Sequence, residues 1–213
     1  MSEEKENRRE KLIENFTAVL LAITTTFGAW AAYYSTLWGG KANEQSVQSI
    51  MTLSNSNTSY LEALSDLSNT KLDEMKDDIF YLEWKQMITN KDPDSAYYFG
   101  RLNPALQEDI LKKTSDSTNK YDATLAENYN LINAKLASSD SVYAQAISTM
   151  ESGQKAGGEG DRFTLITVLY TIVLFFAGLA SLKTSHRLKL IYLVCSSLVF
   201  IGTTVFFFTL PFP

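Results

Sequence analysis

The stretch that decides the fold is FTAVLLAITTTFGAWAAYYSTLW, residues 16–38. It contains no charged side chain, and about 20 apolar residues in a helix suffice to cross the roughly 30 Å hydrocarbon core of a bilayer. Two similar stretches follow, FTLITVLYTIVLFFAGLASL at 163–182 and LKLIYLVCSSLVFIGTTVFFFTL at 188–210. We therefore predict an all-α integral membrane protein with three transmembrane helices.

The chain between the first two stretches is polar, acidic and helical in pattern. Glycine and proline are sparse in the whole sequence, at 10 and 4 residues, which favours long helices over sheets with many turns. We expect one soluble helical domain at 39–162. The expected remaining parts are a cytoplasmic N-terminal tail at 1–15, a cytoplasmic loop at 183–187 and a short tail at 211–213.

Three helices are expected within this domain, at about 41–88, 104–113 and 117–151. Lys91-Asp92-Pro93-Asp94 is expected to end the first helix, because the residue before proline is pushed out of helical angles. Asn103-Pro104 is a good helix start, with Asn as the cap and Pro at the first helical position. The run of Ser, Asn and Thr at 54–59 is a plausible place for a kink, since these side chains compete for backbone hydrogen bonds.

Both long helices carry apolar residues at three- and four-residue steps, so we expect the two stripes to bury against each other. The result would be an extended antiparallel helical hairpin, resembling a coiled coil, with the aromatic residues at 97–99 as a plug at its tip. The stripe residues are Ile50, Leu61, Leu64, Leu72, Met75, Ile79 and Leu82 on the first helix, and Tyr121, Leu125, Tyr129, Ile132, Leu136, Tyr143, Ile147 and Met150 on the second.

The glycines at 153, 157, 158 and 160 are expected to form a flexible joint before the second span. A phosphate-binding role is disfavoured, because no strand precedes them and no Lys-Ser/Thr follows.

Orientation follows from Lys and Arg in short segments beside the spans. The residues that set it are Arg8 and Arg9 in the tail, and Lys183 and Arg187 in the loop. We therefore expect the N-terminus in the cytoplasm, and the soluble domain and C-terminus outside it. An aromatic belt would lie at the outer end of the first span, formed by Trp30, Tyr33, Tyr34 and Trp38.

Small residues lie along the spans, where they let helix backbones approach closely in lipid. We expect these residues first of all to pack the three spans of one chain together. Packing between chains is the second alternative, and a hydroxyl-lined pore is the third. No charge lies deep in any span, which argues against ion-coupled transport. The candidate packing or pore residues are Thr17, Thr24, Gly28, Ala32, Ser35, Gly178 and Gly202.

No residue pattern points to an enzyme, a metal site or a bound cofactor. One cysteine, Cys195, and one histidine, His186, cannot form the usual zinc ligand set. The acidic pairs Asp73-Glu74, Asp77-Asp78 and Glu108-Asp109 lie beside lysines, as in solvated charge pairs on helices. A net charge of −5 without a basic stripe argues against nucleic-acid binding.

Residues 16–44 and 161–181 resemble a group of small bacterial three-pass membrane proteins. The similarity lies in the Trp30–Trp38 spacing followed by Gly39 and Ala42, and in the run from Leu174 to Gly178. A third shared element is the run Arg101-Leu102-Asn103-Pro104. The resemblance implies one span, a helical extracytoplasmic insertion and two closing spans, and it implies no particular activity.

The functional expectation is a non-enzymatic protein of a prokaryotic cell (inner) membrane that acts as a scaffold, sensor or accessory subunit. Its partners would be the lipid bilayer and either copies of itself, as a homo-oligomer, or another envelope protein. The reason is that amphipathic helices often bury their apolar face against another helix. The alternative is a homo-oligomeric channel with the first span lining the pathway.

Overall fold

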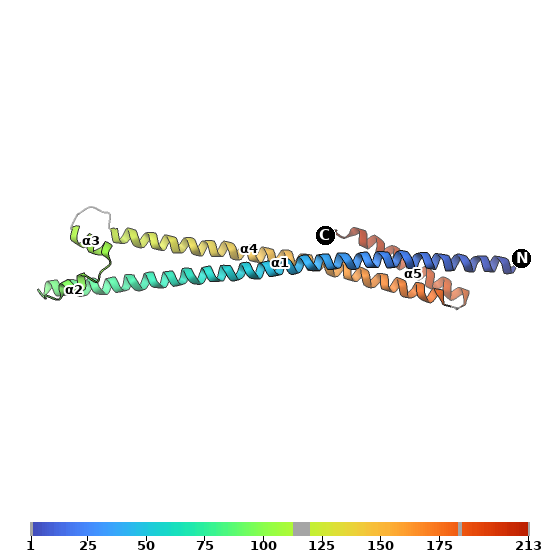
Figure 1. Cartoon of the computed structure of the whole chain (residues 1–213), viewed down its shortest axis with the longest axis horizontal. Helices are drawn as coiled ribbons and strands as arrows, with labels where there is room; N and C mark the ends of the chain where they lie inside the picture. Colours follow the sequence, from blue (N-terminus) through green and yellow to red (C-terminus); the bar gives the residue numbers. More distant parts are fainter. Residues whose placement is uncertain (1, 113–119, 183–184, 213) are drawn as a thin grey trace. The chain divides into compact units, whose positions relative to one another are not determined.

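The computed structural model is shown in Figure 1. It describes residues 2–112, 120–182 and 185–212, including every side chain in these ranges except those of residues 2–7, 9 and 186. Within these ranges the chain is helical and contains no strand. The helices are α1 (Ser2–Thr89), α2 (Ser95–Phe99), α3 (Pro104–Lys112), α4 (Lys120–Ser181) and α5 (His186–Thr209).

Three of these helices are long and apolar enough to cross a membrane, namely α1, α4 and α5. The apolar segments that satisfy this criterion lie within Glu10–Thr89, Lys120–Ser181 and Arg187–Thr209. The prediction of an all-helical protein with three candidate membrane spans is therefore confirmed.

The helix α1 is longer than predicted. It continues without a break from the first apolar stretch into the polar region, where separate helices at 16–38 and 41–88 were expected. The polar run at 54–59 stays helical, and two of its hydroxyls donate to backbone carbonyls: Thr58 Oγ1 to Ser54 at 3.0 Å and Ser56 Oγ to Ser139 at 2.8 Å.

The flexible joint predicted at the glycine cluster is wrong. All four glycines lie inside α4, and Gly153 and Gly160 are buried. A Cβ atom built on Gly153 would lie 3.2 Å from the Ala42 carbonyl oxygen, and one on Gly160 would lie 3.4 Å from that of Ser35. These two glycines therefore serve the close approach of two helix backbones.

The segment between α1 and α3 agrees with the expected stop and start signals. Lys91 has a φ of 58°, in the left-handed region where a helix cannot continue. Asn103 Oδ1 accepts a hydrogen bond from the Ala105 N–H at 2.9 Å, as a helix cap does. The aromatic run predicted as a plug forms the short helix α2, whose Phe99 ring lies 5.7 Å from the Trp84 ring.

The chain divides into two compact units. We call them the terminal unit, Met1–Gln48 with Ser148–Pro213, and the central unit, Ser49–Ile147. The terminal unit contains the three apolar stretches; it continues ten residues past the predicted end of the first span and begins fifteen residues before the predicted start of the second.

Aromatic rings fill the core of the terminal unit. Phe163 and Phe207 are fully buried, and their ring centroids lie 5.8 Å apart in an edge-to-face arrangement. Phe27 from α1 packs edge-on against Phe207 at 5.9 Å. The Tyr170 hydroxyl is 3.1 Å from the Thr204 hydroxyl, so α4 and α5 are also joined by a hydrogen bond.

Candidate functional site

Small and hydroxyl residues fill the contact between α1 and α4 in the central unit. Ser49 Oγ donates to the Ala146 carbonyl at 2.7 Å, and Ser56 Oγ donates to the Ser139 carbonyl at 2.8 Å. The two residue numbers in each pair add up to 195, so the helices pair in opposite chain directions. The next pair by the same rule, seven residues further, is Ala63 with Ile132, and both are buried.

The same numerical rule holds inside the terminal unit. Ser35 Oγ donates to the Gly160 carbonyl at 3.0 Å. Ala42 is the residue whose carbonyl lies closest to the Cβ position of Gly153. On α1, therefore, a small residue every seven positions marks the buried face, and we call this set of α1 and α4 residues the small-residue seam. Its members are Ser35, Ala42, Ser49, Ser56 and Ala63 on α1, and Gly160, Gly153, Ala146, Ser139 and Ile132 on α4.

The apolar stripe predicted to bury α1 against α4 is exposed instead. Leu61, Leu72 and Leu82 are 64%, 58% and 64% exposed. At 100° per residue the stripe lies within roughly 40° of one line along the helix, on a face different from the seam. We call it the outer stripe, and its members are Ile50, Leu61, Leu64, Leu72, Met75, Ile79 and Leu82, all exposed.

The corresponding stripe on α4 is only partly buried. Tyr121 and Ile132 are buried as predicted, whereas Tyr143 and Met150 are about half exposed. From Ser139 onward the buried positions of the seam are small residues, and Tyr143 and Met150 lie off this face. A seven-residue repeat of Ser, Ala and Gly in the sequence was the signal that could have identified this face.

A buried carboxylate organises the end of the central unit that contains α3. Asp77 is 4% exposed, so the prediction of a solvated charge pair is wrong for this residue. Its Oδ1 accepts from the Asn103 backbone N–H at 2.8 Å, and its Oδ2 accepts from the Tyr121 hydroxyl at 3.1 Å. One α1 side chain therefore fixes both the start of α3 and the first turn of α4.

Neighbouring acidic groups connect the same helices. Glu74 accepts a hydrogen bond from the Tyr129 hydroxyl at 2.7 Å, and Asp66 pairs with Lys135 at 2.5 Å. Burial, followed by the negative charge of Asp77, raises the pKa of Tyr121 above its ordinary value. The hydrogen bond to Glu74 raises the pKa of Tyr129, and the one to Asp66 raises the pKa of Lys135.

A small polar cavity of about 80 Å³ lies beside Asp77, and a more open depression of about 320 Å³ lies beside Lys135. Among the residues that the structure describes, no group of three His, Cys, Asp or Glu side chains has the arrangement of a metal site. The carboxylates here accept hydrogen bonds from neighbouring helices, so the arrangement supports a structural role. The cavity is lined by Thr70, Asp73, Glu74, Asp77, Asn103, Tyr121, Thr124, Leu125 and Asn128.

The small-residue face predicted on the first span is mostly packed inside the terminal unit. Thr17 and Thr24 are buried, and each hydroxyl donates to the carbonyl four residues earlier in its own helix. The Cβ position of Gly28 lies 3.6 Å from Tyr170 Cβ. Ala32, however, is exposed, and Ala31 is the residue that is fully buried.

The other predicted packing residues differ among themselves. Ser35 joins α1 to α4 through Gly160 and through the Thr164 hydroxyl, 2.8 Å away. Gly178 is half-buried, whereas Gly202 is exposed and a Cβ there would meet open space.

The four aromatic residues of the predicted belt have different surroundings. Trp38 Nε1 donates to the Pro211 carbonyl at 3.3 Å, and the Tyr34 ring packs 5.5 Å from the Phe163 ring. Trp30 and Tyr33 are exposed. The belt itself stays a prediction.

Two of the four orientation-setting residues can be placed. Arg8 and Arg187 are exposed, near the starts of α1 and α5. The Arg9 side chain and Lys183 lie outside the described residues.

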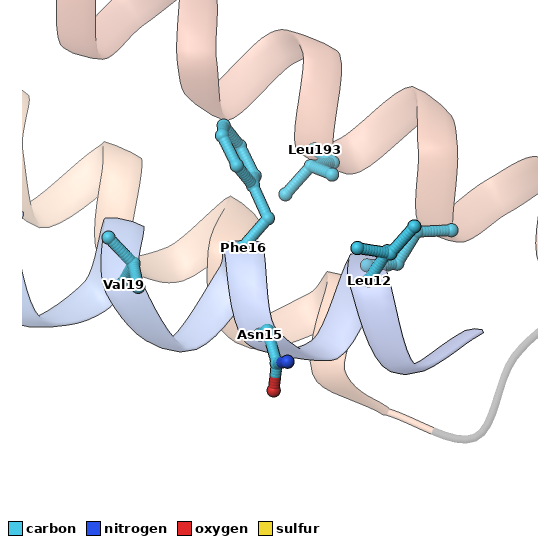
Figure 2. Close-up of a pocket in the computed structure, with 6 residues that line it drawn as sticks. Leu12, Asn15, Phe16, Val19 and Leu193 are labelled. Carbon is cyan, nitrogen blue, oxygen red and sulfur yellow. The ribbon is translucent and has the colours of Figure 1, made fainter. Parts of the chain in front are cut away.

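An apolar groove of about 600 Å³ lies between α1 and α5 (Figure 2). Phe16 of α1 and Leu193 of α5 point toward each other across it, with Leu12 beside them, while Asn15 points away. The groove is lined by Leu12, Ile13, Asn15, Phe16, Val19 and Leu193.

Comparison with protein-family models, with curated proteins and with solved structures finds no match to this chain. The resemblance to small bacterial three-pass proteins therefore stays a prediction.

Proposed function

We propose that this chain is a non-enzymatic membrane protein that acts as a scaffold, sensor or accessory subunit. In this proposal the terminal unit is anchored in the cell (inner) membrane of a prokaryote, with the N-terminus in the cytoplasm. The central unit extends outside the membrane as a helical hairpin and presents the outer stripe to a partner.

The exposed outer stripe is the observation that carries the proposal. The seam already holds α1 against α4, so the stripe is not needed for packing within the chain. Its seven side chains, at roughly 100 Å² of apolar surface each, amount to about 700 Å², close to the ~800 Å² that each partner contributes to a standard interface. An apolar helix face of this extent is typical of a surface that binds another helix.

The charges beside the stripe favour a different protein over a second copy of this chain. Two copies anchored in one membrane would pair in parallel, with Leu72, Met75, Ile79 and Leu82 as the core. In such a pair, Lys71 of one copy would face Lys76 of the other copy, and Asp78 would likewise face Glu83. Both contacts are between like charges, which disfavours the parallel homodimer.

A photo-cross-linker placed at Leu72 or Leu82 in native membranes tests the proposal. We expect a specific product from both positions, with a mass different from that of two copies of the chain. The matched control is Ser59, which is exposed on the same helix away from the stripe. Equal products from Ser59, or no product from either leucine, would contradict the proposal.

The channel alternative has less support. Thr17, Thr24 and Gly28 face neighbouring helices of the same chain, and both threonine hydroxyls are already hydrogen-bonded to their own helix. A pathway lined by this face would require those contacts to open. Conductance steps from reconstituted protein that change in Thr24→Leu would favour the channel over the scaffold.

A further inference from the structure

We propose that the groove between α1 and α5 binds one anionic phospholipid, with an acyl chain against Phe16 and Leu193 and the headgroup phosphate at Lys189. The proposal depends on the terminal unit lying in a bilayer. It does not depend on which partner the central unit binds.

The apolar part of the site is the groove itself. Five of its six lining residues are apolar, and the sixth, Asn15, points away from the space between Phe16 and Leu193 (Figure 2). A volume of about 600 Å³ is sufficient for a hydrocarbon chain. Both helices belong to the same compact unit, so the groove is a feature of one packed structure.

Lys189 supplies the first independent indication of an anionic ligand. Its side chain is only 8% exposed, and none of the described residues forms an ion pair or hydrogen bond with it. A lysine that is nine-tenths buried is normally paired. Lys189 lies one helical turn before Leu193 and about 40° from it around α5, so it is next to the groove-lining Leu193, on the side of the buried Ser196.

The charges on α1 supply the second indication. Arg8 lies one turn before Leu12, about 40° from it around the helix and on the groove face. Glu10 and Glu14 lie about 160° from Leu12, on the opposite face. This end of the groove thus has a cation on each of the two helices, while Glu10 and Glu14 lie on the opposite face of α1.

These features match the two halves of a phospholipid with a net negative charge. Basic pockets between membrane-spanning helices are the general means by which proteins select anionic headgroups. The groove is open rather than enclosed, which suits an acyl chain that enters it from the side. A free phosphate ion would use Lys189 but would gain nothing from Phe16 and Leu193.

Native mass spectrometry of the full-length protein tests the proposal. The purified protein is equilibrated in detergent with equal amounts of dioleoylphosphatidylglycerol and dioleoylphosphatidylcholine, and the retained lipids are counted. We expect one phosphatidylglycerol to be retained in preference to phosphatidylcholine. In Lys189→Gln the preference should fall about fivefold, since one basic contact near the membrane surface is worth about 1 kcal/mol.

Arg187→Gln is the matched control. It removes the same charge two residues away, but position 187 lies about 120° from Leu193 and off the groove face. It should keep the preference of the wild-type protein. Equal retention of both lipids by the wild-type protein, or equal loss in Lys189→Gln and Arg187→Gln, would overturn the proposal.

Two further arms separate the possible explanations. Leu193→Trp fills the groove and keeps Lys189, so it should reduce the retention of both lipids; unchanged retention would overturn the acyl-chain contact. Millimolar inorganic phosphate should not displace the lipid, and displacement would show a phosphate site instead. Circular dichroism measures whether each variant keeps its helix content. If Lys189→Gln loses helix content, lipid retention by Leu193→Trp tests the proposal instead.

Discussion

Ser56 and Ser139 hydrogen-bond each other's backbone across the small-residue seam. Ser56 Oγ donates to the Ser139 carbonyl at 2.8 Å, and Ser139 Oγ donates to the Ser56 carbonyl at 2.8 Å. The two hydroxyl oxygens are 3.2 Å apart. This reciprocal pair satisfies two buried hydroxyls and brings the two helix backbones close together, which a pair of leucines could not do.

The first prediction concerns this pair. Ser56→Ala should lower the free energy of unfolding by about 1 kcal/mol, because a net hydrogen bond is lost in a buried site. The double variant with Ser139→Ala should cost less than the sum of the two single variants, since residues in contact are coupled. Thermal unfolding in detergent, followed by circular dichroism, measures the cycle. Ser54→Ala, at an exposed position on the same helix, should leave the unfolding midpoint unchanged or slightly raised.

The second prediction compares two glycines within one helix. At Gly153 a Cβ would lie 3.2 Å from the Ala42 carbonyl oxygen and 3.3 Å from Ser46 Oγ. Gly153→Val should therefore destabilise the protein by about 1–3 kcal/mol through overpacking.

At Gly158 a Cβ would meet nothing within 4 Å. Gly158→Ala should stabilise the same helix by about 0.5–1 kcal/mol, because alanine loses less conformational entropy than glycine. The same unfolding measurement applies to both variants. An equal response of the two positions would mean that the close approach at Gly153 is not a constraint.

The comparison of Leu72 with Ser56 explains what sequence reasoning could and could not find. The spans and the helical class followed from the length and composition of three apolar stretches, and the cap at Asn103 followed from local chemistry. The packed face of α1 did not follow, because periodicity identifies an amphipathic stripe without saying what covers it. Ser56 is on the packed face and Leu72 on the open one, the reverse of their order in hydrophobicity.

The buried carboxylate shows a second limit of the sequence. Asp77 is next to Asp78 in the sequence and near Lys76, so it looked like one member of a solvated charged run. Its burial depends on α3 and α4, which bring Asn103 and Tyr121 to it from 26 and 44 residues away. No local pattern contains that information.

The third prediction follows from these partners. Asp77→Asn keeps the shape of the side chain but turns an amide N–H₂ group toward one of the two donors. We expect a loss of about 1–3 kcal/mol in unfolding free energy and faster hydrogen exchange at the Asn103 amide. Asp78→Asn makes the same chemical change at the neighbouring exposed position and should affect neither quantity. Unchanged exchange at Asn103 in Asp77→Asn would contradict this role.

The fourth prediction concerns pH. Glu108 accepts hydrogen bonds from Lys112 and Lys120, and these bonds lower the pKa of Glu108 from 4.5 to about 2. Because the pKa is lower in the folded state, the stabilisation is present above the unfolded value of about 4.5 and is lost as pH falls toward 2. The contact is exposed, so salt should weaken it.

A carboxyl carbon NMR titration of Glu108 measures this pKa directly. We expect a midpoint near 2 in the wild-type protein and a midpoint closer to 4.5 in Lys120→Gln, which removes one of the two donors. Lys155→Gln removes a charge of the same kind from α4, 35 residues along that helix from Lys120, and should leave the midpoint unchanged. An ordinary midpoint in the wild-type protein would mean that the two lysines do not hold Glu108 in solution.

The last prediction separates the outer stripe from the core of the central unit. Leu72→Ser and Leu82→Ser remove exposed side chains, so each should change the unfolding free energy by less than about 0.5 kcal/mol. Ile132→Ala removes a buried side chain of similar size, 4% exposed in the seam, and should cost about 2–5 kcal/mol. Both sets are compared in detergent by thermal unfolding of the full-length protein. A surface reserved for a partner contributes little to the stability of the isolated protein. A large loss of unfolding free energy in Leu72→Ser would therefore show that the outer stripe is packed within the chain.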